Sequence, residues 1–124
     1  MFKNALVSVS DKTQIVDFIL PLHKAGMRVV STGGTAKLLK ENGVEVVDVS
    51  EQTGHPEVMD GRVKTLHPKV HMALLAREGH EGDAKLLTEQ GLQPFDLVVG
   101  NLYPFSEALK KGLPLKDQVE FIDI

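Results

Sequence analysis

Two adjacent glycines between an apolar run and a helix-forming segment constrain the fold of this chain most. In the segment 29–39, a β-branched run leads into Gly33 and Gly34, and a helical pattern follows at once. Glycines let the backbone turn sharply and approach a ligand without a Cβ in the way. We expect Thr35 to be the N-cap of the following helix, whose free N–H groups then point back into the loop. Hydroxyl groups gather at this turn, from Ser31, Thr32 and Thr35.

This turn has two interpretations. Free backbone N–H groups, the positive end of a helix dipole and several hydroxyls together suit a phosphate group. In the alternative, the turn simply joins a strand to a helix and the glycines serve backbone geometry alone, since glycine-rich turns often give false positives. The turn by itself does not separate the two.

The surrounding pattern predicts an α/β fold. A helix is expected between Asp11 and Gly26, with Ser10 or Asp11 able to cap it. Its apolar face consists of residues at i, i+3, i+4 and i+7, namely Ile15, Phe18, Ile19 and Leu22. Apolar strands are expected at 2–8, 27–30 and 44–49, with a second helix at 35–42. Helices between apolar strands indicate three layers, with a mostly parallel sheet covered by helices on both faces.

The second half of the chain is predicted to add one strand and four helices. Segment 50–60 has no sustained periodicity, and we interpret it as an irregular connection with one short helical turn. The strand is expected at 95–100, and the helices at 68–77, 83–90, 104–111 and 114–121.

Two hydroxyl-rich loops are expected at one edge of this sheet. The loops 8–12 and 31–35 both follow strands, and ligands of parallel sheets bind beyond the carboxyl ends of the strands. Lys12 adds a positive charge that a phosphate favours, whereas the helix dipole disfavours a lysine that is merely a surface residue of a first turn. Asn101 and Tyr103 reach the same edge if the last strand is parallel. The phosphate interpretation is therefore preferred.

Composition excludes several other classes of function. The 124 residues form one domain, 1–124, and the net charge of -3 argues against a nucleic-acid surface or a polybasic membrane patch. The absence of cysteine removes disulfides, thiolate metal sites and cysteine nucleophiles, and it fits a cytoplasmic protein. No apolar run approaches the roughly 20 residues of a membrane span, and the amino terminus lacks a signal-peptide core.

The segment 61–71 gathers basic residues and two histidines. Pro68 is expected at the first position of a helix and forces His67 out of the α region. His67 and His71 have the spacing of a metal-binding helix, but the glutamate of that motif is missing and Pro68 disturbs the spacing. We therefore expect no metal, with one histidine lining a site and the other structural or exposed.

Four motifs in register resemble a known family. They are Ser-Val-Ser-Asp-Lys at 8–12, Ser-Thr-Gly-Gly-Thr-Ala at 31–36, Gly-Arg-Val-Lys-Thr-Leu-His-Pro at 61–68 and Asn-Leu-Tyr-Pro-Phe at 101–105. Together they resemble the amino-terminal IMP cyclohydrolase domain of the bifunctional purine biosynthesis protein, AICAR transformylase/IMP cyclohydrolase. The resemblance covers essentially the whole chain.

The resemblance implies a methylglyoxal-synthase-like fold that closes FAICAR to IMP with loss of water, and it implies no cofactor. Phosphate-binding residues carry over onto Ser10, Lys12, Ser31, Thr32, Gly33 and Thr35. The base and ribose side carries over onto Arg62, His67 and Asn101. Catalytic residues carry over onto Lys64, Thr65, Tyr103 and Asp123. The family also implies a homodimer that is normally fused to an AICAR transformylase domain.

The sequence departs from the family at its end. The family pattern continues with glycines and a further helix whose lysine partners the aspartate, whereas this sequence stops at Ile124. We therefore expect a truncated domain with an intact phosphate site, impaired turnover and a frayed Asp123.

Three alternatives to the cyclohydrolase remain. A nucleotide-binding regulatory module of the same fold, as attached to carbamoyl phosphate synthetases, shares the phosphate loops without needing Lys64, Tyr103 or Asp123. A methylglyoxal synthase fits the third and fourth motifs less well. A structural interaction domain leaves both hydroxyl-rich loops unexplained.

Overall fold

Four parallel strands form the centre of the molecule. The computed structural model describes residues 1–61 and 63–119. The strands are β1 (Asn4–Ser8), β2 (Arg28–Ser31), β3 (Val46–Asp48) and β4 (Leu97–Gly100), in the spatial order β3-β2-β1-β4. All three pairings are parallel, so the expectation of a parallel sheet is confirmed. In particular β4 is parallel to β1, which brings the segment after Gly100 to the same edge as the loop after Ser8.

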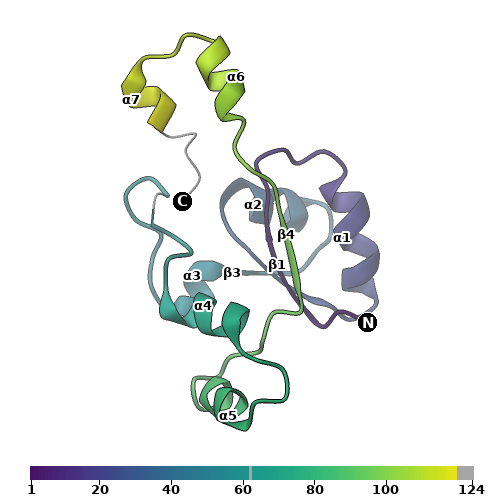
Figure 1. The fold of residues 1–124 in the computed structure, drawn as a ribbon. Coiled ribbons are helices and arrows are strands. Elements are labelled where there is room, and N and C mark those ends of the chain that lie inside the picture. Colours follow the sequence, from purple (N-terminus) through teal and green to yellow (C-terminus); the bar gives the residue numbers. More distant parts are fainter. Residues whose placement is uncertain (62, 120–124) are drawn as a thin grey trace.

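Seven helices accompany the sheet in the described ranges. They are α1 (Ile15–Lys24), α2 (Gly33–Glu41), α3 (Val49–Thr53), α4 (Pro68–Leu75), α5 (Glu81–Glu89), α6 (Phe105–Lys110) and α7 (Leu115–Gln118). Figure 1 shows α6 and α7 standing away from the sheet, beyond the end of β4. None of the helices in the described ranges is long and apolar enough to cross a membrane.

The three-layer arrangement follows from the alternation of side chains along β1. Ala5 and Val7 point to one face, where they pack with Ile19 of α1 and Leu39 of α2. Leu6 points to the other face and packs in a second core. That core also contains Val30 of β2, Val49 of α3 and Val70 of α4. Because β1 is buried on both faces, its central residues are all apolar, as expected for a central strand of a parallel sheet.

Several local expectations are wrong. The second helix begins at Gly33 with Thr32 as its N-cap, so Thr35 lies inside the first turn. The first helix begins only at Ile15 after Gln14, later than Asp11 suggested. Phe18 is 52% exposed and does not belong to the buried face of α1. The helix expected at 114–121 is described as Leu115–Gln118, and its expected end falls within residues 120–124, which lie outside the described ranges.

Candidate functional site

The amino terminus of α2 lies directly after the carboxyl end of β2 and carries no opposing charge of its own. The first N–H groups of any helix have no acceptor within the helix, and the first turn of α2 contains no acidic residue. The positive end of the helix dipole is therefore uncompensated by that turn. Gly33 has a φ of +57°, a backbone conformation that glycine adopts without the steric cost of a Cβ.

Two lysines flank this first turn, one on each side. A Cβ placed on Gly34 would lie 3.3 Å from Cε and 3.8 Å from Nζ of Lys12. A Cβ placed on Gly33 would lie 3.9 Å from Nζ of Lys64. Two ammonium groups from distant parts of the chain thus meet at one helix N-terminus. We call Lys12, Lys64 and the first turn of α2 (Gly33 to Thr35) the cationic rim.

Lys12 is held in place by the loop that carries it. Its Nζ donates to the carbonyl oxygens of Val9 at 3.1 Å and Ser10 at 3.2 Å. An ammonium group has three donors, so one remains for an external acceptor. The side chain is a preoriented positive charge, as expected from its position after β1.

Asn101 clamps the same loop to the end of β4. Its Oδ1 accepts from the backbone N–H of Ser10 at 2.6 Å and of Asp11 at 3.2 Å, and its Nδ2 donates to the carbonyl of Asp11 at 2.8 Å. The amide oxygen and one amide N–H are therefore engaged with backbone. Asn101 lies at the predicted edge, and its contacts here stabilise the β1–α1 loop, which delivers Lys12.

Ser31 and Thr35 serve the interior in this structure. The Ser31 hydroxyl is buried and donates to the carbonyl of Val7 on the neighbouring strand. The Thr35 hydroxyl, also buried, donates to the Val9 carbonyl at 3.1 Å and accepts from the Val9 N–H at 3.2 Å. In this structure their protons join β2 and α2 to β1, and the binding of a phosphate by Ser31 and Thr35 stays a prediction. The backbone N–H of Thr35 still belongs to the cationic rim.

A small polar cavity opens beside the cationic rim. It encloses about 40 Å³ and is lined by Thr32, Gly33, Asp48, Val49, Ser50, His55, Glu57 and Lys64. Ligand pockets for small organic molecules are typically several hundred Å³. This cavity is too small for a nucleotide, so most of a nucleotide bound at the cationic rim has to lie outside the cavity.

The loop before α4 brings further predicted residues close to this cavity. His67 adopts extended backbone angles and caps α4, with its Nδ1 accepting from the N–H of Lys69 at 3.1 Å. The expected effect of Pro68 on His67 is thus confirmed. The rings of His67 and His55 lie 6.3 Å apart. The Thr65 carbonyl accepts from the N–H of His67 at 2.8 Å, which folds the segment after Lys64 into a tight turn.

The remaining predicted site residues divide into two groups. Tyr103 follows β4 at the predicted edge and is 41% exposed. Arg62 and Asp123 lie outside the described residues. Among the described residues, no group of three histidine or acidic side chains could hold a metal ion.

Sequence reasoning missed Glu57. Its Oε2 accepts from the Thr32 hydroxyl at 3.3 Å, and its Oε1 lies 2.5 Å from the position that a Cβ on Gly61 would take. An isolated acidic residue in an irregular loop gives no periodic signal. The available clue was its placement on the opposite side of the Asp60-Gly61 turn signal from Lys64.

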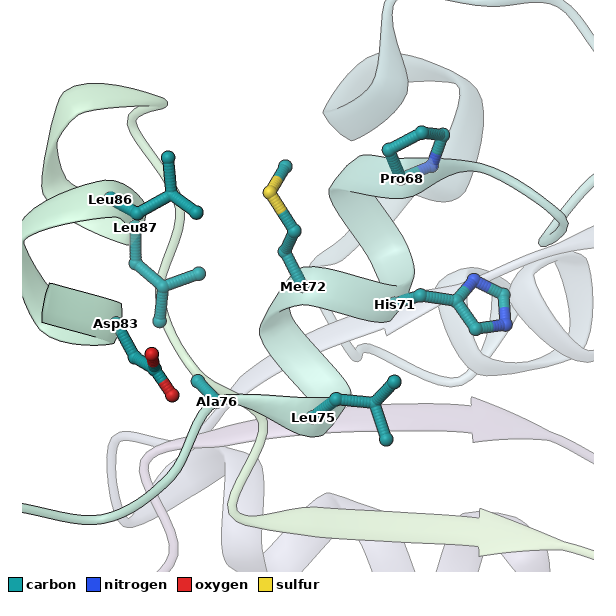
Figure 2. Close-up of a pocket in the computed structure, with 8 residues that line it drawn as sticks. All are labelled: Pro68, His71, Met72, Leu75, Ala76, Asp83, Leu86 and Leu87. Atoms are coloured by element: carbon teal, nitrogen blue, oxygen red, sulfur yellow. The ribbon is translucent and has the colours of Figure 1, made fainter. Parts of the chain in front are cut away.

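Two larger cavities lie elsewhere. One of about 300 Å³ separates α4 from α5, and Figure 2 shows Met72 and Leu75 of α4 together with Leu86 and Leu87 of α5 around it. Asp83 on its wall is bound by Arg77, whose hydrogen bonds hold the pKa of that carboxyl well below its ordinary value. The other, of about 520 Å³, lies beside Arg28 and Gln52. Neither contains Lys12, Lys64 or the first turn of α2.

Comparisons with known proteins point to one family. The family model of the MGS-like domain matches residues 14–124. A relative from Bacillus subtilis (strain 168), named "Bifunctional purine biosynthesis protein PurH", is 54% identical over 123 residues, which are 98% of this chain and 24% of that protein. A relative of the same name from Persephonella marina (strain DSM 14350 / EX-H1) is 52% identical over 124 residues, which are 100% of this chain and 24% of that protein. The chain thus spans about a quarter of the length of these curated relatives.

A solved structure has a similar fold. The one described as "Crystal structure of ForH" superposes with a TM-score of 0.73 at 39% sequence identity, covering 83% of this chain and 54% of that one. The resemblance to the bifunctional purine biosynthesis protein, inferred from four motifs, is confirmed by the names of the curated relatives.

Proposed function

This chain belongs to the MGS-like domain family, and on that premise we propose that it is an IMP cyclohydrolase domain of a bifunctional purine biosynthesis protein, closing FAICAR to IMP with loss of water. The observation that carries the proposal is the cationic rim. A helix N-terminus flanked by Lys12 and Lys64 suits a phosphorylated substrate whose reacting group lies a short distance from its phosphate.

The two lysines have different roles in this proposal. Lys12 lies beside Gly34 and is held by backbone carbonyls, so it binds the substrate 5′-phosphate together with the N–H groups of α2. Thr32 and Ser10 border the same phosphate position. Lys64 lies beside Gly33, and in our proposal its ammonium group faces the reacting formamide.

The chemistry needs charge stabilisation and proton transfer. When the carboxamide nitrogen attacks the formyl carbon, the carbonyl π electrons move to the formyl oxygen, which becomes an oxyanion. In our proposal the Lys64 ammonium and the Thr65 backbone N–H stabilise that oxyanion. The attacking nitrogen then loses one proton and the oxyanion gains one to become a hydroxyl group. That hydroxyl takes up a second proton and leaves as water while the formamide nitrogen loses its proton and forms the ring C=N bond, and Asp123 is the proposed acid–base group for these transfers. Because the reaction is intramolecular, holding the two groups in the reactive rotamer supplies much of the rate.

The proposal includes the substrate's base side and the wider assembly. Arg62, His67, Asn101 and Tyr103 are the proposed neighbours of the base and ribose. For Asn101 this role is indirect, through the β1–α1 loop that its amide holds. We further propose a cytoplasmic homodimer fused to an AICAR transformylase domain. The word "bifunctional" in the names of the curated relatives supports the fusion. A regulatory module is not favoured, because the curated relatives are biosynthetic proteins.

The test is to incubate FAICAR with the protein and follow the absorbance of IMP. One sample contains this chain, and a second contains this chain joined to the remaining sequence of the Bacillus subtilis relative. We expect IMP from the joined protein and a lower rate from the chain alone. Absence of IMP in both samples, with folded protein verified by circular dichroism, would contradict the proposed function.

A further inference from the structure

We propose that Glu57 is a positioning residue of the candidate site, which holds the loop of Lys64 against the amino terminus of α2. This inference rests on the proposed function and adds a residue to it. Glu57 acts through Thr32 and Lys64, and it is not proposed to touch the substrate.

Glu57 and Lys64 face each other across a short hairpin. Val58 and Val63 form an antiparallel bridge, with N–H···O distances of 3.1 and 3.3 Å in the two directions. Residues 57 and 64 are the next opposed pair outside that bridge. Glu57 and Lys64 are therefore an acid and a base that follow the bridge on its two chain segments, and opposite charges at such positions attract one another.

The turn of this hairpin is conformationally costly. Met59 and Asp60 have φ values of +57° and +54°, and Gly61 has a φ of +81°. Residues other than glycine pay a steric penalty in this region, and such residues persist only where surrounding contacts impose them. The hairpin therefore needs tertiary contacts to hold its shape.

The Glu57 carboxylate supplies such contacts on two sides. Oε2 accepts from the Thr32 hydroxyl at 3.3 Å, which ties the hairpin to the N-cap of α2. Oε1 lies 2.5 Å from the position of a Cβ on Gly61, while Nζ of Lys64 lies 3.7 Å from that same position. The carboxylate and the ammonium thus share the space that Gly61 leaves open. A side chain at residue 61 would have to displace the carboxylate, because 2.5 Å is shorter than any normal contact.

The charge of Glu57 explains why Lys64 stays at the cationic rim. Lys64 lies near the positive end of α2, which by itself repels an ammonium group. The Glu57 carboxylate lies beside the N-cap residue Thr32 and near the space beside Gly61 that the Lys64 ammonium also approaches, and its negative charge offsets that repulsion. Removing the charge should let the Lys64 side chain move away from the rim, while the binding of an anion to Lys12 and α2 continues.

The first experiment compares Glu57→Gln with wild type in the joined protein described above. Glutamine keeps the size of the side chain and an acceptor for the Thr32 hydroxyl, but it loses the charge. We expect kcat to fall about tenfold, with no loss of affinity for inorganic phosphate. Glu45→Gln, at an exposed glutamate before β3, is the matched control and should leave both values unchanged.

A second readout does not depend on activity. Lysines are pulse-labelled with an amine acylating reagent, and the labelling of each residue is followed by mass spectrometry. We expect Lys64 to label severalfold faster in Glu57→Gln because its side chain is no longer held, and Glu57→Asp to recover part of the protection. The exposed Lys24 of α1 is the internal reference.

These readouts separate the possible failures. No IMP from wild type contradicts the proposed function, and the labelling of Lys64 then still decides the role of Glu57. Unchanged labelling of Lys64 in Glu57→Gln overturns the positioning role. So does a parallel loss of kcat, phosphate affinity and melting temperature, since that pattern belongs to a residue that merely stabilises the fold.

Discussion

The amino ends and the carboxyl ends of the parallel strands, here called the amino edge and the carboxyl edge of the sheet, use similar polar residues in different ways. At the amino edge the Asp96 carboxylate accepts from the N–H groups of Lys3 at 2.8 Å and Asn4 at 2.9 Å. The Asn4 amide donates to the carbonyls of Gln93 and Pro94, and its oxygen accepts from Arg28. At the carboxyl edge, the cationic rim gathers two ammonium groups and a helix N-terminus with no acid in its first turn.

This contrast indicates which edge binds a ligand. Buried and half-buried polar groups are normally satisfied by partners within the protein, and the amino edge follows that rule through short backbone contacts. At the carboxyl edge Glu57 offsets part of the charge of Lys64, whereas Lys12 and the first N–H groups of α2 have no acidic partner in that turn and favour an added anion. We therefore interpret the amino edge as structural and the carboxyl edge as the binding edge. Each of the following predictions tests either the binding role of the carboxyl edge or the structural role of the amino edge.

The largest effect is expected for Lys64→Met in the joined protein. Loss of a single group that stabilises a developing oxyanion typically lowers kcat by about 10²–10³-fold. The proposed reaction should slow by that factor, measured as IMP formation at saturating FAICAR. Lys24→Met, an exposed lysine in the last turn of α1, is the matched control and should keep the wild-type rate. A rate within threefold of wild type for Lys64→Met would remove Lys64 from the chemistry.

A smaller effect is expected for Lys12→Met on the binding of inorganic phosphate. Replacing one charged donor of an anion site should weaken affinity about tenfold, corresponding to about 1.4 kcal/mol. Isothermal titration with phosphate measures the change, again beside Lys24→Met. Binding should weaken as salt rises, because the rim acts through charge. Equal affinities in Lys12→Met and wild type would place the phosphate elsewhere.

The amino edge should respond in stability and not in binding. Although partial burial raises the pKa of Asp96, hydrogen bonds from the N–H groups of Asn4 and Lys3 outweigh it, and the pKa lies below its ordinary value. A carboxyl with a lowered folded-state pKa stabilises the fold above its unfolded pKa, and that stabilisation is lost as pH falls through the folded pKa.

Asp96→Ala should therefore lower the free energy of unfolding at pH 7 by about 1 kcal/mol, a value kept small because the side chain is exposed. The difference from wild type in urea denaturation should shrink as pH falls below about 4. Affinity for phosphate should not change. A pH-independent difference would mean that the Asp96 charge plays no part.

The sequence predicted the binding edge better than the contacts that build it. Apolar strands separated by helices indicate a parallel sheet, which places the loops after β1 and β2 at one edge. The loop after β4 was expected there only if that strand is parallel, which the structure confirms. The contact of Asn101 with residues 10 and 11 spans 90 or more positions, and no local pattern encodes it. The hydroxyls of Ser31 and Thr35 looked equivalent to that of Thr32 in the sequence. Their direction depends on β1 lying beside them, which only the folded sheet decides.

The hairpin of Glu57 was beyond sequence reasoning for a different reason. Its turn places Met59 and Asp60 at positive φ, a region that is uncommon for residues other than glycine, although aspartate is found there more often than methionine. Propensity therefore pointed to an irregular loop, whereas tertiary contacts impose a bridge between Val58 and Val63. Phe18 shows the opposite error, since its helical spacing was correct and the face that it occupies is uncovered in the described structure.

The smallest effect is expected for Gly34→Ala, which tests how closely Lys12 fits against α2. Gly34 does not have a positive φ, so alanine suits its backbone and gains about 0.5–1 kcal/mol of helix stability relative to glycine. The new Cβ would lie 3.3 Å from Cε of Lys12, which must shift by a few tenths of an ångström. We expect the two effects nearly to cancel in thermal unfolding, while phosphate affinity in titration falls two- to threefold. Gly33→Ala provides the contrast, since its φ of +57° makes alanine cost about 1–2 kcal/mol. If Gly34→Ala weakens phosphate as much as Lys12→Met does, the rim depends on a close fit as well as on charge, whereas an unchanged affinity would show that Lys12 adjusts freely.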